Sequence, residues 1–374
     1  MPILEMLHQR IALLLIFFST QTFAQSKVND GAWSESYDSG YYYLNRFKPG
    51  PSMKYFSKAI YLSRELPQWY RAASLFGAGQ ATWYAGNFHG AADTVEMAIK
   101  AYPANNKDEI ILALRVLSNI YDELGSFEKA FTTIQTALSM NKSTAEYNTV
   151  LPLVQMGKLY KNIGDFESAM HYYQQALAIN PTPAEYPFRE LYHSLGGLYV
   201  ARQQFDSAAF FYRKSLIGNP LSKLIRLRLG ELHILQSRYD SAYLYLEPLY
   251  TEARESEDIN VIAGTSIGLA KVMRYRADLP AASRLATEAF NLASERGVYR
   301  FYQEAAELLA LINEEMGDTK SALYFHKLSD SLQQASASDV YKGQLFAFRQ
   351  KWDAAAHAAD LRAFLSGFVC GLVW

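Results

Sequence analysis

Residues Gly264, Ser266 and Gly268 have the Gly-x-Ser-x-Gly spacing of a nucleophile elbow, in which the serine hydroxyl attacks an acyl group. Such an elbow requires a strand before the serine and a helix after it. The repeat spacing described below instead places this stretch within a helix, where small residues allow close packing against a neighbour. A serine hydrolase using Ser266 is therefore a remote alternative, and we expect no catalytic residue in the chain.

The histidines do not have the spacing of metal ligands. No two of them are four residues apart, and none has the adjoining glutamate of a zinc-protease helix. The chain holds 36 Lys and Arg against 37 Asp and Glu, so no general positive field attracts nucleic acid. We therefore expect no metal, no cofactor and no nucleic-acid partner.

A small residue recurs along the chain at nearly regular intervals. The series is Gly40, Gly79, Ser118, Gly157, Gly196, Gly230, Ala270 and Ala310, in which every interval is 39 or 40 except the one of 34 between Gly196 and Gly230. A second small residue follows each by twelve positions: Ser52, Ala91, Ala130, Ala169, Ala208, Ala242, Ala282 and Ala322. Two antiparallel helices approach closely only where each presents a small side chain, so this double series predicts eight helical hairpins.

Turn signals lie between the two small residues of several units. Four units have a glycine followed by a helix-capping residue: Gly86-Asn87, Gly125-Ser126, Gly164-Asp165 and Gly317-Asp318. Glycine accepts the left-handed backbone at a helix C-terminus, and the next residue caps the following helix. These pairs are expected to form the turns of the hairpins.

The repeated unit resembles the tetratricopeptide repeat. Residues 150–183 carry the residues of that pattern at its offsets: Leu153, Met156-Gly157, Tyr160, Ala169, Tyr173, Ala176 and Pro181. The resemblance implies an all-α fold, an α-solenoid of about eight hairpins (period 34 to 40), which binds protein segments and has no enzymatic activity. Most of the intervals are longer than is usual for this family, so we expect longer second helices or longer connections, such as residues 182–190.

In tetratricopeptide proteins the first helix of each repeat lines a concave groove that holds peptides. The residues that the resemblance places in this groove are Arg115, Asn119, Lys158, Lys161, Asn162 and His193. Arg115 and Asn119 match half of the family's carboxylate clamp, whereas Gln155, Glu190 and Ser194 replace its other half. The resemblance thus implies a protein or peptide partner in a mildly basic groove suited to an acidic segment, beside the alternative of ordinary solvated helix faces.

Residues 1–24 have the pattern of a cleaved secretory signal. An apolar run covers residues 11–18, and Thr22-Phe23-Ala24 has the small-x-small form accepted by signal peptidase. We expect cleavage near Ala24 and a periplasmic or extracytoplasmic location. Residues 25–71 then form an atypical N-terminal repeat or cap, and residues 72–336 form the repeat array.

The C-terminal region adds two further segments. Residues 337–362 are expected to form a connecting helix, and residues 363–374 contain no charged residue. This tail is interpreted as the start of a transmembrane helix in a chain that continues further, with membrane contact through residues 363–374. The alternative is a short helix folded back on the last repeat.

The signal, the lengthened repeats and the segment Asp330-Ser331-Leu332 resemble the sensory half of bacterial membrane-bound signalling proteins. In these proteins a histidine kinase or a helix-turn-helix output domain follows the membrane helix. The leading hypothesis is therefore an extracytoplasmic ligand-sensing domain. The alternative is a soluble periplasmic adaptor in envelope assembly or secretion.

Overall fold

The computed structural model describes residues 30–46, 48–140, 146–179, 186–256, 258–296, 299–334 and 346. The predicted signal peptide (1–24) and apolar tail (363–374) lie outside this part of the chain. So does the predicted connecting helix (337–362), except for Phe346, whose ring centroid lies 5.8 Å from that of Phe131. No described helix combines the length and apolarity needed to cross a bilayer.

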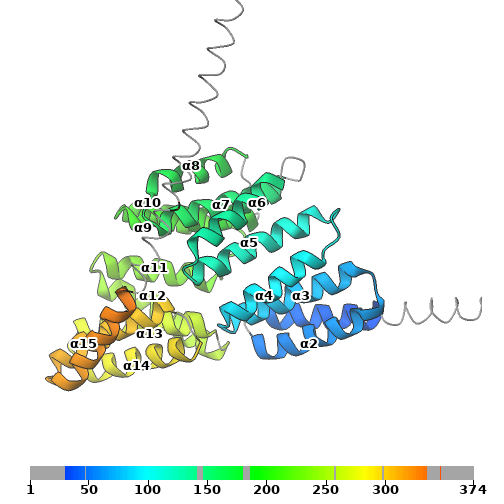
Figure 1. Cartoon of the computed structure of the whole chain (residues 1–374). Coiled ribbons are helices and arrows are strands. Elements are labelled where there is room, and N and C mark those ends of the chain that lie inside the picture. The colour runs from blue at the N-terminus through cyan, green and yellow to red at the C-terminus, as the bar shows by residue number, and fades with distance from the viewer. Residues whose placement is uncertain are drawn as a thin grey trace, which may run out of the picture. The chain divides into compact units, whose positions relative to one another are not determined.

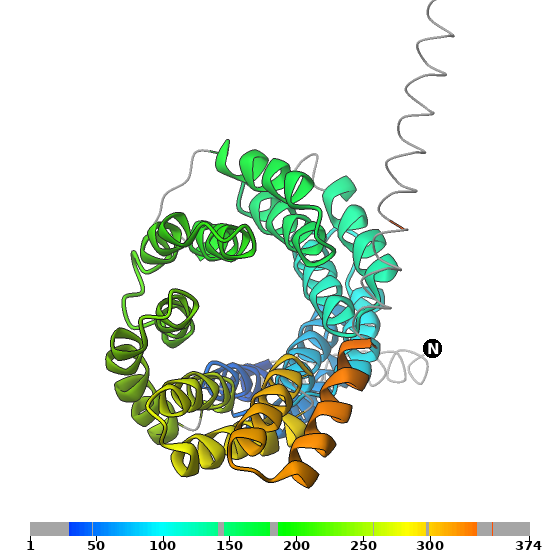
Figure 2. The same ribbon diagram turned by 90° about the vertical axis from the view of Figure 1, so that its left-hand side faces the viewer.

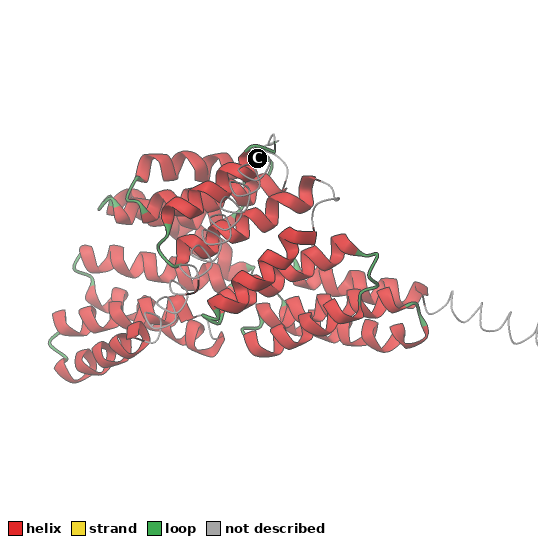
Figure 3. Cartoon of the chain, turned by 45° about the horizontal axis from the view of Figure 1, so that its top comes forward, coloured by secondary structure: helices red, strands yellow, loops and turns green. Residues whose placement is uncertain are grey.

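The described residues form helices and turns only (Figure 3). The helix over residues 30–44 pairs with α2 (Pro49–Leu62), which a short 3-10 turn, η1 (Ser63–Glu65), follows. The next pairs are α3 (Gln68–Tyr84) with α4 (Phe88–Ala101), α7 (Glu146–Asn162) with α8 (Phe166–Leu177), and α9 (Tyr186–Ala201) with α10 (Phe205–Ser215). Helices α5 (Lys107–Glu123) and α6 (Phe127–Met140) follow α4 and precede α7 in the chain. The last are α11 (Lys223–Leu235) with α12 (Tyr239–Glu255), α13 (Ile259–Tyr275) with α14 (Leu279–Arg296), and α15 (Tyr299–Glu315) with the helix over residues 319–334 (Figure 1). The all-α architecture of helical hairpins is confirmed.

The chain divides into two compact units. Unit 1 comprises residues 1–120 and 256–258, and unit 2 comprises residues 121–255 and 259–374. In unit 2 the first helices contact one another, α7 against α9, α11 against α13 and α13 against α15, and each also contacts the second helix of its own hairpin. The hairpins of this unit follow one another in chain order, from green to orange in Figure 2. We call the surface formed by α7, α9, α11, α13 and α15 the first-helix face.

The recurring small residues are the points where the two helices of a hairpin touch. A Cβ atom added to Gly157 would lie 2.3 Å from the Tyr173 ring, and one added to Gly196 would lie 2.4 Å from the Tyr212 ring. The large residue that covers the glycine is four positions after the second small residue. Where alanine replaces glycine, at Ala270, the residue at this covering position is Ala286. The sizes of the two residues are therefore matched at Ala270, whereas Ala310, the other alanine of the series, has His326 at the covering position.

The turns between paired helices follow a common geometry. Gly86, Gly125, Gly164 and Gly317 have the expected left-handed backbone, with φ between 67° and 85°. Asn87, Asp165 and Asp318 accept a hydrogen bond from the backbone N–H three residues later. Three other hairpins turn through Gln203, Ser237 and Ala277 at φ of 56° to 61°. All seven residues lie seven positions after the small residue of their first helix, so the turn is kept even without glycine.

The extra length of the repeats lies in most of the first helices and, as expected, in two of the second helices, since α12 has 17 residues and α14 has 18. Helices α3, α5, α7, α13 and α15 each have 17 residues and begin eleven positions before their small residue. By contrast, α11 has 13 residues and begins only seven positions before Gly230, which accounts for the single short interval of the series. Residues 186–190, expected in a connection, belong to α9. The long period therefore extends the helices that carry the predicted groove.

The close approach at Gly157 generates a stability prediction. In Gly157→Ala the new methyl group would overlap the buried Tyr173 ring, so we expect the free energy of unfolding to fall by about 1–3 kcal/mol. Urea unfolding monitored by circular dichroism measures the change. Gly50→Ala is the control, because no atom lies within 4 Å of the added Cβ and alanine favours the helix. Equal effects of the two substitutions would contradict the packing account.

Candidate protein-binding site

Ser266 lies in the middle of α13 and not on a strand-to-helix turn. The helix runs without interruption from Ile259 to Tyr275, and the fully buried Ser266 hydroxyl donates to Glu288 Oε2 at 3.0 Å. A Cβ added to Gly264 or Gly268 would lie 2.6 Å from the side chains of Leu227 and Leu246, respectively. The apparent elbow is therefore a helix-packing motif, and its geometry does not expose a nucleophile.

Two of the predicted groove residues, Arg115 and Asn119, lie in the part of α5 that belongs to unit 1. The Asn119 side chain donates to the Arg115 carbonyl oxygen at 3.1 Å, so this amide is engaged within its own helix. Arg115 Nε is buried and has no hydrogen-bond partner among the described residues. The Asn119 amide is therefore engaged within α5, whereas Arg115 Nε is not.

The other four predicted residues lie on neighbouring first helices of unit 2. Lys158, Lys161 and Asn162 belong to α7, and His193 belongs to α9, which packs against α7. Asn162 donates to both carboxylate oxygens of Asp122, at 3.0 and 2.9 Å. Burial raises the pKa of Asp122, although Asn162 and the two lysines oppose that shift. The structure therefore brings these four residues together at one end of the first-helix face.

Glu190 is the centre of a charged group on this surface. It accepts a hydrogen bond from Lys158 Nζ, and its second oxygen lies 3.9 Å from His193 Nδ1. Burial favours the protonated acid, but Lys158 and His193 outweigh it and hold the pKa of Glu190 well below its usual value. Burial lowers the pKa of His193, so the imidazole is neutral near pH 7. The positive charge of Lys158 is thus compensated by Glu190. From the sequence, Glu190 was only a residue that departs from the carboxylate clamp of the family.

Buried polar side chains lie beside this group. Gln155 on α7 is 2% exposed, and neither its amide nitrogen nor its amide oxygen has a hydrogen-bond partner in the described structure. The buried Ser194 hydroxyl on α9 makes no hydrogen bond of good geometry, although it interacts with the Tyr173 hydroxyl and so opposes the rise that burial causes in the pKa of Tyr173. Gln155 and Ser194 each lie two positions before the small residue of their repeat, Gly157 and Gly196. Sequence reasoning missed their importance, although this shared repeat position could have revealed it.

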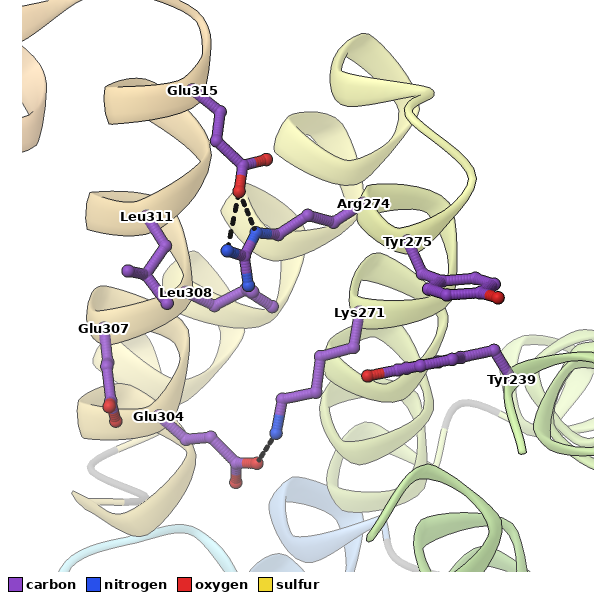
Figure 4. Close-up of a pocket in the computed structure, with 9 residues that line it drawn as sticks. All are labelled: Tyr239, Lys271, Arg274, Tyr275, Glu304, Glu307, Leu308, Leu311 and Glu315. Carbon is purple, nitrogen blue, oxygen red and sulfur yellow. Dashed lines mark hydrogen bonds and ion pairs between the residues drawn. The ribbon is translucent and has the colours of Figure 1, made fainter. Parts of the chain in front are cut away.

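The ion pair of Lys158 with Glu190 recurs further along the first-helix face. Lys271 on α13 donates to Glu304 on α15 at 2.7 Å (Figure 4). In both pairs the lysine follows its small residue by one position, and the glutamate precedes the next small residue by six. Arg228 adds a further pair within α11, to Glu231 at 2.7 Å. The face is therefore polar and its cations are paired, which suits recognition by hydrogen bonds and charge, not covalent chemistry.

No cluster of three or more His, Cys, Asp or Glu side chains suited to a metal occurs among the residues that the structure describes. What the first-helix face offers is a set of paired charges, an unpartnered amide and a buried hydroxyl held on rigid helices. Such groups can position a bound chain segment.

The lowered pKa of Glu190 predicts a pH-dependent contribution to stability. Because the folded-state pKa lies below the ordinary value, this contribution is present above about pH 4.3 and is lost as the pH falls through the folded-state pKa. We expect Glu190→Gln to lower the free energy of unfolding by about 1–3 kcal/mol at pH 7, because Lys158 is left unpaired. The difference from wild type should shrink towards acidic pH in urea unfolding.

Glu96→Gln is the control for this experiment, because its pair with Lys100 is solvent-exposed and 3.9 Å long. Its effect should stay within about 0.5 kcal/mol at every pH. A pH-independent loss in Glu190→Gln would show that the shift of its pKa does not contribute to folding.

The comparisons with known proteins agree with this fold. The model of the tetratricopeptide repeat family matches residues 116–144 and 152–183. No curated protein matches the sequence.

Among solved structures, the chain is similar to the Rap conjugation gene regulator of the plasmid pLS20 in complex with the Phr* peptide. The TM-score is 0.62 at 13% identity, covering 82% of this chain and 96% of that one. It is also similar to a Rap protein complexed with competence and sporulation factor (TM-score 0.58, 13% identity, 83% and 99% covered) and to the apo form of RapI (TM-score 0.51, 13% identity, 70% and 98% covered). At this identity the likeness concerns the fold. The chain thus contains tetratricopeptide repeats at residues 116–144 and 152–183, within an all-helical fold similar to that of the Rap structures.

Proposed function

We propose that the chain binds a peptide or an extended protein segment across α7 and α9 of unit 2, on the first-helix face. The observation that carries this proposal is the buried Gln155 side chain on α7, whose amide nitrogen and oxygen both lack a partner among the described residues, with the Ser194 hydroxyl at the equivalent position of the adjacent α9. A buried polar group without a partner costs about 1–3 kcal/mol. A segment that supplied the missing partners would recover this free energy on binding.

The chemistry of these groups fits a peptide main chain. The Gln155 amide can donate to a carbonyl oxygen and accept from an N–H group, as the main chain of an extended segment requires. The Ser194 hydroxyl can do either. Beside them, Lys158, Glu190 and His193 provide a charged group that can discriminate among side chains. The lysines alone would favour an acidic segment. Because Lys158 is already paired with Glu190, the arrangement instead favours a segment held by hydrogen bonds to its main chain.

Structural similarity supports the same class of partner. Two of the similar Rap structures were solved with a bound peptide or factor. For this chain, a peptide partner is an inference from the shared fold together with the polar groups described above.

The cellular setting is a further part of the proposal. The apolar run at residues 11–18 and the cleavage pattern ending at Ala24 support export. The chain would then be the extracytoplasmic ligand-sensing portion of a membrane-bound signalling protein, with residues 363–374 starting its membrane segment. A soluble periplasmic adaptor is the alternative, and the position of the protein after cell fractionation separates the two.

Replacement of Gln155 should affect stability and binding in opposite directions. Gln155→Leu removes two unpartnered polar atoms from a buried site, so the free energy of unfolding should rise by up to about 2 kcal/mol. Affinity for peptides selected on the wild-type chain from a random display library should fall at least about fivefold, measured by isothermal titration calorimetry. Gln174→Leu, on the exposed face of α8, is the control and should change neither quantity. Unchanged affinity in Gln155→Leu would place the binding site elsewhere.

The proposed export and membrane attachment can be tested in the native host. Export predicts a mature N-terminus at Gln25, determined by sequencing the purified protein. A membrane segment at residues 363–374 further predicts recovery of the protein with membranes in a form that resists salt but not detergent. A protein that retains Met1 would contradict export. A processed protein in the soluble periplasmic fraction would favour the adaptor.

A further inference from the structure

A cavity of about 410 Å³ opens on the first-helix face at the far end of unit 2, between α13 and α15. Figure 4 shows its lining residues, with Tyr239 at the start of α12 completing one wall. Leu308 and Leu311 provide apolar surface from α15, and three glutamates of the same helix line it as well: Glu304, Glu307 and Glu315. The volume lies within the range of small-ligand sites and accommodates a long side chain.

The cations of this cavity are already engaged. Lys271 donates to Glu304 at 2.7 Å, and Arg274 makes two hydrogen bonds to Glu315 Oε1, at 2.9 and 2.6 Å (Figure 4). Glu307 is exposed, and no described residue forms an ion pair with it. Two cations and three carboxylates leave the lining with one excess negative charge. An acidic ligand would have to displace Glu304 or Glu315 from its partner, whereas a basic ligand finds Glu307 available.

The aromatic wall also favours a cation. The rings of Tyr239 and Tyr275 stack at 4.2 Å with an angle of 17°, and Tyr275 is 64% exposed. Elsewhere the chain covers tyrosine rings with its own cations: Arg276 lies 4.5 Å from the Tyr243 ring centroid, and Arg46 lies 3.6 Å from that of Tyr42. No described cation covers Tyr239 or Tyr275. Figure 4 shows the tyrosine pair and Glu307 on opposite sides of the cavity, with Lys271 and Glu304 between them, so the exposed tyrosine face adds to the cavity's preference for a cation without contacting Glu307.

We infer that this cavity binds a lysine or arginine side chain of the partner segment, with its aliphatic stem against Leu308 and Leu311 and its charged head at Glu307. The inference rests on the proposed function and names a second contact of the same partner. The partner therefore carries a basic residue, separate from the part of its main chain that contacts Gln155. The match of an apolar stem to the leucines and of a cation to the remaining acid distinguishes lysine and arginine from other side chains.

The test uses the full chain with ¹³C-labelled leucine methyl groups and three capped tripeptides: acetyl-Gly-Arg-Gly-amide, the same peptide with uncharged citrulline, and the same peptide with glutamate. The arginine peptide should shift the methyl resonances of Leu308 and Leu311 in a saturable manner. Citrulline should bind at least about threefold more weakly, and glutamate should cause no saturable shift. Saturation by the glutamate peptide, or equal binding of arginine and citrulline, would overturn the inference.

Matched variants separate the cavity from general surface charge. Glu307→Gln should weaken the arginine peptide about threefold to tenfold, whereas Glu314→Gln, the same change on the same helix outside the cavity, should leave it unchanged. Equal effects of the two variants would contradict the assigned site. Leucine methyl groups on α7 and α9, at Leu153 and Leu195, report the proposed main-chain contact separately. If display-selected peptides shift those groups while the arginine peptide leaves Leu308 and Leu311 unchanged, only the cavity inference fails.

Discussion

The close approach of the two helices in each hairpin is the constraint on which the structure depends. In five hairpins a glycine of the first helix lies beneath a larger side chain of the second, as Gly157 lies beneath Tyr173 and Gly230 beneath Leu246. Interiors pack at crystal-like density, so a single added methyl group at this point requires the covering residue to change. The pair Ala270 and Ala286 shows the compensated form, in which a larger first residue is matched by a smaller second one. Each repeat therefore has its spacing fixed by one local contact, and the array follows from repeating it.

This constraint also determines where recognition can occur. The contact uses the side of each first helix that faces its own hairpin partner, and the stacking of hairpins uses a second side. A third side remains, and in unit 2 it carries paired charges such as Lys158 with Glu190 and Lys271 with Glu304. Glu190 and Glu304 each lie six positions before the small residue of their own first helix, within a stretch that even the short α11 retains.

Much of this fold could be predicted from the sequence because its cause is local. The small residues, the turn glycines and the capping residues act within one hairpin, and their spacing is visible in the chain. The left-handed turns at Gln203, Ser237 and Ala277 could not be found in this way, since such a backbone costs a non-glycine residue about 1–2 kcal/mol and has no residue signature. Hydrogen bonds across the turn hold it there, as between Asp278 N–H and the Met273 carbonyl oxygen at 2.9 Å, and these use main-chain atoms whatever the side chain. The site was less predictable from the sequence, because Glu190, the partner of Lys158, lies on the next repeat. That the Gln155 amide lacks hydrogen-bond partners depends on the residues that packing brings around it.

The central claim is that the first-helix face of unit 2, and not the surface of the second helices, binds a protein segment. Site-specific photo-crosslinking in the native host tests it most directly. A benzophenone amino acid at Gly197, which has room around it on α9, is compared with the same amino acid at His171, exposed on α8. The account predicts that mass spectrometry finds one peptide segment linked to position 197 and absent from position 171. Crosslinks of a common partner at position 171 and none at position 197 would contradict it.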